Sequence, residues 1–148
     1  MMKKRKLLTY NLKIAGITEN LEIIREFIRK LAIKSGFEEE TAGQIELAVD
    51  EACTNVIRHA YNNDHRRKID IKVMLDAEKM QICISDKGKG FNPDLLPKPD
   101  LRAYVETSKR GGLGIHLMRS LMDEVQFQFN PPKKNTVTLT KYMSKKSA

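Results

Sequence analysis

Apolar residues recur along the chain with two different periods, which predicts a mixture of helices and strands. Spacings of three and four residues are typical of helices with one apolar face, and alternation is typical of strands with one buried face. The helical spacing predicts helices over about 18–35, 38–61 and 112–122. Alternation, partial in the first segment, predicts strands over 7–14, 69–75, 80–84, 125–129 and 136–142.

Local signals mark where these elements begin and end. Thr18 is a predicted N-cap for the first helix, and Gly36 is the residue expected to end it. The second helix begins in the acidic run 38–40, because negative charge favours a helix N-terminus. Residues 91–110 combine prolines with many charges and show little periodicity. A loop of that length is usually functional or mobile, so we expect a lid in this segment.

The predicted order of elements is β-α-α-β-β-loop-α-β-β. Long crossovers alternate with hairpins in this order, which predicts a mixed, mostly antiparallel sheet with three helices on one face. The fold class is therefore α+β, in the form of a two-layer α/β sandwich. With 148 residues we expect one domain over 1–148, with basic tails at 1–6 and 143–148.

The charge and composition exclude several classes of protein. The formal net charge is +8, but six of these charges come from Lys and Arg in the two tails. The remainder shows no basic stripe with aromatic residues, so we expect no direct nucleic-acid binding. No apolar run is long enough for a membrane span or a signal peptide, so the expected location is the cytoplasm. Cys53 and Cys83 lack metal-ligand spacing and are predicted to be reduced structural thiols.

The first candidate motif is Glu51-x-x-x-Asn55 on the second helix. Four residues make about one helical turn, so the two side chains lie nearly above each other, at the border of the apolar face. Ala48 and Ala52 are small neighbours that leave room over the helix. A carboxylate and an amide oxygen are ligands that Mg²⁺ accepts. A solvated helix flank is the alternative interpretation of this motif alone.

The second motif is the run Asp86-Lys-Gly88-Lys-Gly90, directly after a predicted strand. An aspartate at a strand end can accept a hydrogen bond from an amine of a ligand, and glycines let the backbone approach that ligand closely. An ordinary turn has the same pattern.

The third motif is Arg110-Gly-Gly112-Leu-Gly114, which runs into the third helix. Glycines at a helix start leave backbone N–H groups free, and the helix dipole favours negative charge there. The motif is a candidate phosphate cradle, but it is not a Walker A loop, because no Gly-Lys-Ser/Thr follows. A flexible glycine-rich loop before a helix remains the alternative.

Taken in order, the three motifs resemble those of the GHKL ATPase superfamily, whose fold is the Bergerat α/β sandwich. The resemblance extends from about residue 7 to residue 142. It is closest to the stand-alone anti-sigma serine/threonine kinases of bacterial stress response and sporulation, through the segments 51–61, 111–118, 121–125 and 138–142.

This resemblance implies a role for each candidate residue. Glu51 would be the catalytic general base and Asn55 a ligand of Mg²⁺. Asp86 would bind the adenine amino group of ATP. The remaining nucleotide-binding residues would be Gly88 and Gly90 at the adenine pocket, Gly112 and Gly114 at the phosphates, Arg110 at the γ-phosphate and Thr138 beside the adenine.

The leading functional hypothesis is therefore an ATP- and Mg²⁺-dependent protein kinase. It would phosphorylate a serine of an anti-sigma-factor antagonist and sequester a sigma factor, thereby regulating transcription. The resemblance also implies a homodimer, and the first helix, with Arg25 and Arg29, is a candidate partner face. The alternative is a non-catalytic, ATP-binding partner-switching module; nucleic-acid binding by the basic tails is a third interpretation.

Overall fold

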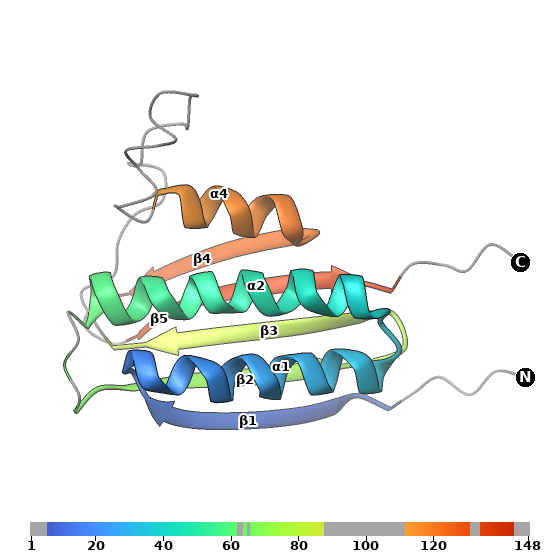
Figure 1. The fold of residues 1–148 in the computed structure, drawn as a ribbon, viewed down its shortest axis with the longest axis horizontal. Helices are drawn as coiled ribbons and strands as arrows, with labels where there is room; N and C mark the ends of the chain where they lie inside the picture. The colour runs from blue at the N-terminus through green and yellow to red at the C-terminus, as the bar shows by residue number, and fades with distance from the viewer. Residues whose placement is uncertain (1–5, 62–63, 65, 88–111, 131–133, 144–148) are drawn as a thin grey trace, which may run out of the picture.

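The chain folds into one sheet with helices on one of its faces (Figure 1). A computed structural model describes residues 6–61, 64, 66–87, 112–130 and 134–143. The helices are η1 (Thr18–Asn20), α1 (Leu21–Ser35), α2 (Glu39–Asn55), η2 (Val56–Ala60) and α4 (Gly112–Leu121). The strands are β1 (Leu8–Ala15), β2 (Lys68–Leu75), β3 (Lys79–Asp86), β4 (Glu124–Asn130) and β5 (Lys134–Tyr142). Each predicted helix and strand is present, so the α+β prediction is confirmed.

The five strands lie in the order β1-β2-β3-β5-β4, and all four neighbouring pairs are antiparallel. The sheet therefore has no parallel pair among the described strands, although a mixed sheet was expected. Helices α1 and α2, with the short η1 and η2, connect β1 to β2, and the two strands pair antiparallel (Figure 1). The segment that follows β3 contributes α4 and then β4, while β5 inserts between β3 and β4.

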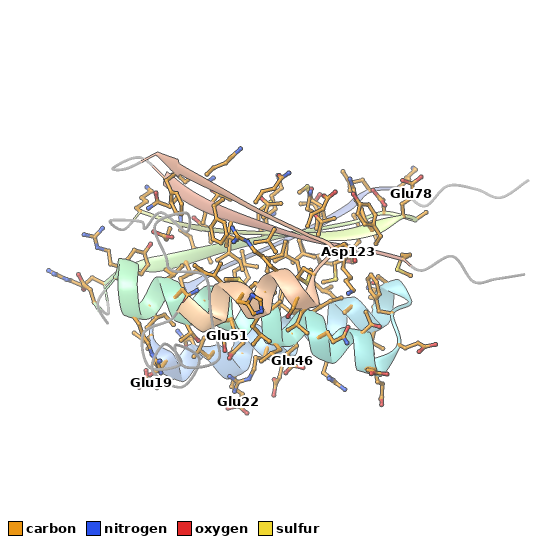
Figure 2. The ribbon with its side chains drawn as sticks, turned by 90° about the horizontal axis from the view of Figure 1, so that it is seen from above. Glu19, Glu22, Glu46, Glu51, Glu78 and Asp123 are labelled. Atoms are coloured by element: carbon orange, nitrogen blue, oxygen red, sulfur yellow. The ribbon has the colours of Figure 1, made fainter. Side chains whose placement is uncertain are left out.

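Helices α1, α2 and α4 pack on the same face of the sheet, as the view from above shows (Figure 2). Alternation along the strands directs one set of side chains into this interface. Burying each such aliphatic side chain contributes roughly 1.5–3 kcal/mol. The largest fully buried side chains include Ile24, Ile28, Ile45, Val49, Ile57, Ile69, Ile71, Ile82, Ile84 and Leu139.

The N-cap predicted for α1 is wrong. Thr18 belongs to the short 3₁₀ turn η1, and α1 begins at Leu21 with Asn20 at its N-cap. The Asn20 side chain donates to the carbonyl of Ala15 at 2.9 Å, which ties the turn to the end of β1. The predicted stop is confirmed, since Gly36 has φ 112°, a left-handed conformation that glycine adopts at little cost.

The second helix changes its winding immediately after Asn55. Residues Val56–Ala60 form a π-helical turn, closed by the hydrogen bond from the Tyr61 N–H to the Val56 carbonyl at 2.8 Å. Such turns insert one residue into a helix and often occur at functional sites. Ile57 in this turn and Tyr61 directly after it are both buried, at 0% and 5% exposure.

Both cysteines are free thiols, and Cys53 is buried. Burial raises the pKa of the Cys53 thiol, which keeps it protonated and unreactive. Among the described residues, no helix has the length and apolar character needed to cross a membrane.

Candidate active site

Glu51 and Asn55 lie on the last turn of α2, on the side that faces α4. Asn55 is only 4% exposed, and its Nδ2 atom has no hydrogen-bond partner among the described residues. A buried amide group without a partner is costly in a folded protein. Because Nδ2 is a donor, such a group is consistent with a ligand whose acceptor atom completes its hydrogen bonding.

The Glu51 carboxylate is half-buried beside Asn55. Burial is the main reason that the pKa of Glu51 is raised above its usual value; Asp50 raises it further and Arg58 opposes the shift. A carboxylate with a raised pKa is a stronger base than a solvated one, which suits general-base catalysis near neutral pH.

Gly114 brings the start of α4 against this pair. A Cβ atom at position 114 would lie 2.6 Å from Glu51 Oε2 and 3.7 Å from Asn55 Nδ2. The absence of a side chain therefore keeps the space between the carboxylate and the helix open. The first turn of α4, from Gly112, also carries backbone N–H groups without helical partners. The catalytic candidate and the predicted phosphate cradle thus meet in space.

Asp86 is the last residue of β3 and is 8% exposed. Its partner across the sheet is Asn135 of β5, which is 2% exposed. Asn135 Nδ2 donates to Asp86 Oδ1 at 3.2 Å. The amide holds the carboxylate in place on the face of the sheet that the helices cover.

A narrow cavity joins these two groups of residues. It has a volume of about 20 Å³, which is room for about one water molecule. An adenine ring needs more space, so binding there requires its walls to separate. The lining residues come from α2, η2, β3, α4, β4 and β5: Ala52, Asn55, Val56, Asp86, Met118, Phe127, Phe129, Asn135, Thr136 and Val137. We call this cavity the narrow cavity.

The structure brings four of the predicted site residues together: Glu51, Asn55, Asp86 and Gly114. Gly112 begins the helix that carries Gly114. Gly88, Gly90 and Arg110, with the predicted lid, lie outside the described residues.

Thr138 is not brought to this site. It pairs with Cys83 on the face of the sheet away from the helices, where Cys83 Sγ and Thr138 Oγ1 are 3.7 Å apart. The residue beside Asp86 is instead Asn135, which the sequence interpretation missed. Val137 and Leu139 alternate toward the helices, so continuing the same alternation backward would have found Asn135 on their face.

The two arginines of the candidate partner face on α1 are engaged within the molecule. Arg25 Nη1 lies 2.9 Å from Asp50 Oδ1, and Arg29 Nη1 lies 3.2 Å from Glu46 Oε2. These ion pairs link α1 to α2 along their partly exposed edge.

The residues present fit ATP in three respects. An acidic group lies at a strand end, the first N–H groups of α4 have no partner within the helix, and the Asn55 amide nitrogen, which has no partner among the described residues, lies beside a half-buried carboxylate. These residues fit Mg²⁺ less directly. The described residues contain no group of three or more His, Cys, Asp or Glu side chains that could hold a metal. Mg²⁺ is usually bound through one or two carboxylates together with phosphate oxygens and water, and the amide oxygen of Asn55 would supply one ligand of such a site.

The fold and the site define a class of ATP-binding protein, and sequence comparison gives the same result. The profile of the histidine kinase-like ATPase domain matches residues 15–141, and the chain belongs to this family.

Within the family, the chain is similar to serine-protein kinases of the RsbW type. It is 32% identical to RsbW of Bacillus velezensis and of Bacillus subtilis, over 90% of this chain and 84% of each relative. RsbW of Bacillus pumilus is 33% identical, over 90% of this chain and 85% of the relative. The chain is therefore a member of the serine-protein kinase branch of the histidine kinase-like ATPases.

Solved structures share the fold. A Mycobacterium tuberculosis protein with RsbU and RsbW domains matches 90% of this chain and 32% of its own, with a TM-score of 0.66 at 15% identity. A chain of the SiaB–SiaC complex from Pseudomonas aeruginosa matches 92% of this chain and 89% of its own, with a TM-score of 0.56 at 15% identity.

Proposed function

We propose that this protein is an ATP- and Mg²⁺-dependent anti-sigma factor with serine kinase activity. It transfers the γ-phosphoryl group of ATP to a serine of an anti-sigma-factor antagonist, and it sequesters a sigma factor. The observation that carries the proposal is the half-buried Glu51 carboxylate, held against Gly114 and next to Asn55. A protein that only binds ATP has no need of such a base.

Each residue of the site has a task in this reaction. Glu51 accepts the proton of the attacking serine hydroxyl, and burial makes its carboxylate basic enough for that task. Asn55 offers its amide oxygen to Mg²⁺. When bound, the metal supplies charge neutralisation for the transferring phosphoryl group. The first turn of α4, with Gly112 and Gly114, presents N–H groups to phosphate oxygens.

The adenine end of the site rests on β3 and β5. Asp86 accepts a hydrogen bond from the adenine amino group, and Asn135 holds the Asp86 carboxylate in position. The supporting role predicted for Thr138 is assigned to Asn135. Gly88 and Gly90 would shape the same pocket, and Arg110 would meet the γ-phosphate.

The relatives support a protein partner for this chain. RsbW proteins are named as serine-protein kinases, and the SiaB–SiaC structure is a complex with a protein partner. By analogy, this chain acts on a protein serine. A cytoplasmic homodimer bound to the sigma factor completes the proposal.

Thermal unfolding with and without Mg-ATP tests the nucleotide site. A ligand at 100 times its dissociation constant adds roughly 2.7 kcal/mol to the unfolding free energy. We expect the wild type and Glu51→Ala to be stabilised, and Asp86→Ala to lose the effect. Glu78→Ala, which removes an exposed carboxylate just before β3 and outside both cavities, is the matched control and keeps the stabilisation.

A second measurement separates the kinase from a non-catalytic binding module. Candidate antagonist proteins are incubated with the wild type or Glu51→Ala and labelled ATP. Phosphoserine formed by the wild type alone supports the kinase. Stabilisation by ATP in both, with no phosphoserine on any antagonist that binds, would leave a partner-switching module. No stabilisation at millimolar ATP would overturn the proposed function.

A further inference from the structure

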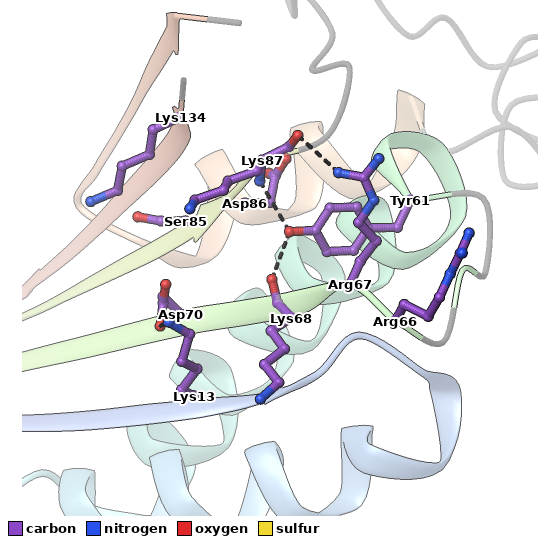
Figure 3. A pocket seen from close by; sticks show the side chains of 10 residues that line it. All are labelled: Lys13, Tyr61, Arg66, Arg67, Lys68, Asp70, Ser85, Asp86, Lys87 and Lys134. Carbon is purple, nitrogen blue, oxygen red and sulfur yellow. Dashed lines mark hydrogen bonds and ion pairs between the residues drawn. The ribbon is translucent and has the colours of Figure 1, made fainter. Parts of the chain in front are cut away.

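A second, larger cavity lies at the end of β3, on the face of the sheet that the helices leave uncovered (Figure 3). Its volume is about 330 Å³, at the lower end of the roughly 300–1,000 Å³ range of small-molecule sites. Its lining residues are Lys13, Tyr61, Arg66, Arg67, Lys68, Asp70, Ser85, Asp86, Lys87 and Lys134. We call it the basic cavity, because six of these ten residues are lysine or arginine.

The positive charge of the basic cavity is only partly compensated. Asp64 forms ion pairs with two arginines of the lining. Its Oδ1 lies 3.1 Å from Arg66 Nε, and its Oδ2 lies 3.7 Å from Arg67 Nε. Asp70 lies 3.9 Å from Lys13, while Asp86 bonds Asn135 on the other side of the sheet.

Three lysines have no carboxylate within ion-pair distance in the part of the chain that the structure describes: Lys68, Lys87 and Lys134. Figure 3 shows the side chains of Lys87 and Lys134 extending toward the side of the cavity where Ser85 lies. The cavity therefore combines ammonium donors with an excess of positive charge, while the Ser85 hydroxyl is hydrogen-bonded to Thr136 at 3.0 Å.

Hydrogen bonds of Tyr61 and Arg67 fix the backbone at the base of the cavity, which we call the floor. The Tyr61 hydroxyl donates to the Lys68 carbonyl at 2.6 Å and accepts from the Lys87 N–H at 3.0 Å. Arg67 stacks its guanidinium 5.8 Å from the centre of the Tyr61 ring, and its Nη1 donates to the Lys87 carbonyl at 3.5 Å. Burial raises the pKa of Tyr61, so its hydroxyl remains a donor at physiological pH. The floor is thus built before any ligand arrives.

We propose that the basic cavity binds a small oligophosphate, meaning a molecule with two or more linked phosphate groups. Ammonium groups act as point charges for phosphate oxygens, and arginine forks add directed donors. Several cations converging on one concave site favour a ligand with several adjacent negative charges over a single carboxylate.

Shape and composition favour a small molecule over a nucleic acid. The cations surround one cavity of small-molecule size instead of following a long groove. The one aromatic residue in the lining is Tyr61, which is 5% exposed and covered by Arg67, so no ring is available to stack on a base. The basic cavity shares only Asp86 with the narrow cavity, and none of Glu51, Asn55 and Gly114 lines it.

The experiment titrates the full chain with inorganic tripolyphosphate in moderate salt and follows backbone amide signals by NMR, with affinity from calorimetry. We expect shifts at Arg67, Lys68, Ser85, Lys87 and Lys134 in the wild type. Lys87→Ala combined with Lys134→Ala weakens binding by about tenfold or more, because each lost ammonium removes a charge-assisted contact.

The control combines Lys30→Ala with Lys72→Ala, which removes the same charge from exposed positions outside both cavities. The control binds within about twofold of the wild type if the site is local, since screened charges at a distance contribute little. Equal weakening in both double variants overturns the proposal, because the attraction is then diffuse. Shifts confined to Glu51, Asn55 and Gly114 also overturn it, because tripolyphosphate then occupies only the phosphate cradle.

Discussion

The end of β3 separates two cavities of opposite character. On the helix side, the narrow cavity is about 20 Å³ in volume and is lined mainly by apolar and amide side chains. On the open side, the basic cavity is about 330 Å³ and is lined mainly by cations. Asp86 contributes to both, and Lys87 follows it directly. The larger of these two cavities therefore lacks the catalytic candidate Glu51, and cavity size alone would have led away from the proposed active site.

The difference follows from where each cavity obtains its polar groups. In the narrow cavity, polar atoms are buried among apolar side chains, so each must be matched by a specific partner. In the basic cavity, charges stay near solvent and can remain in excess. We expect substitutions to have large, specific effects in the first and graded, salt-dependent effects in the second.

The largest expected effect belongs to Glu51→Gln. Removing the proposed general base should lower phosphoryl transfer by roughly 10²–10⁴-fold, while Mg-ATP still stabilises the fold. A radiolabel assay with the antagonist, beside a thermal scan, measures both quantities. Glu46→Gln on the same helix, which removes only the partly exposed pair with Arg29, is the control and changes the rate little. Full activity of Glu51→Gln would show that Glu51 is not the base, and the site beside the narrow cavity would lose its catalytic assignment.

Gly114→Ala tests the contact between α4 and the base. Its Cβ would lie 2.6 Å from Glu51 Oε2, so the flexible carboxylate must move while the fold persists. We expect phosphoryl transfer to fall by roughly tenfold to a hundredfold, because misplacing a catalytic group by about 1 Å has effects of that size.

Gly43→Ala is the control for Gly114→Ala. A Cβ at position 43 meets its nearest atom, Arg29 Nη1, at an ordinary 3.7 Å. This helical substitution should stabilise the protein by roughly 0.5–1 kcal/mol without changing the rate. Equal loss of activity in both variants would mean that helix packing, and not the Glu51 position, is being measured.

Tyr61→Phe tests the backbone at the end of β3, which contributes to both cavities. It leaves the Lys87 N–H without its acceptor, which should cost about 1–3 kcal/mol of unfolding free energy in urea titrations. Because Lys87 adjoins Asp86, binding of both ATP and tripolyphosphate should weaken. Tyr142→Phe loses only an exposed contact with Glu124 and serves as control. If the affinity for only one of the two ligands fell, the two cavities would be independent of each other.

Asn135→Ala has a smaller effect, confined to the narrow cavity. Losing the donor to Asp86 should weaken ATP binding by about five- to tenfold, equivalent to ~1 kcal/mol. Titration calorimetry with Mg-ATP provides the value. Thr138→Ala, on the opposite face, should bind ATP as the wild type does. If Thr138→Ala weakened ATP binding more than Asn135→Ala did, the predicted role of Thr138 beside the adenine would stand.

The smallest effect concerns pH. Burial raises the pKa of Glu51 in the folded state above its usual 4.5, so the folded protein holds this proton more tightly than the unfolded chain. The wild type should therefore lose stability relative to Glu51→Gln as pH rises from 4.5 through the raised pKa. Urea titrations across this range measure the difference between the two proteins. A difference that is independent of pH would contradict a raised pKa.

The elements of the fold were predictable, because their signals are local. Alternation identified β2 and β3, and helical spacing identified α1 and α2. The start of α1 was missed, since Thr18 resembles an N-cap but the chain first forms a 3₁₀ turn anchored by Asn20. The fully antiparallel pairing was also missed, because strand order depends on how distant segments pack.

The sequence by itself determined the α+β fold, the helix that carries Glu51 and Asn55, the strand that ends at Asp86 and the glycines that open α4. These features rest on spacings within one element, which periodicity and turn chemistry reveal. Only the tertiary structure decided that Asn135 rather than Thr138 meets Asp86, and that Gly114 lies against Glu51. It also gathered cations from separate segments into the basic cavity. The physical reason is that strand register and layer packing set contacts between residues far apart in sequence, and no local pattern encodes those distances.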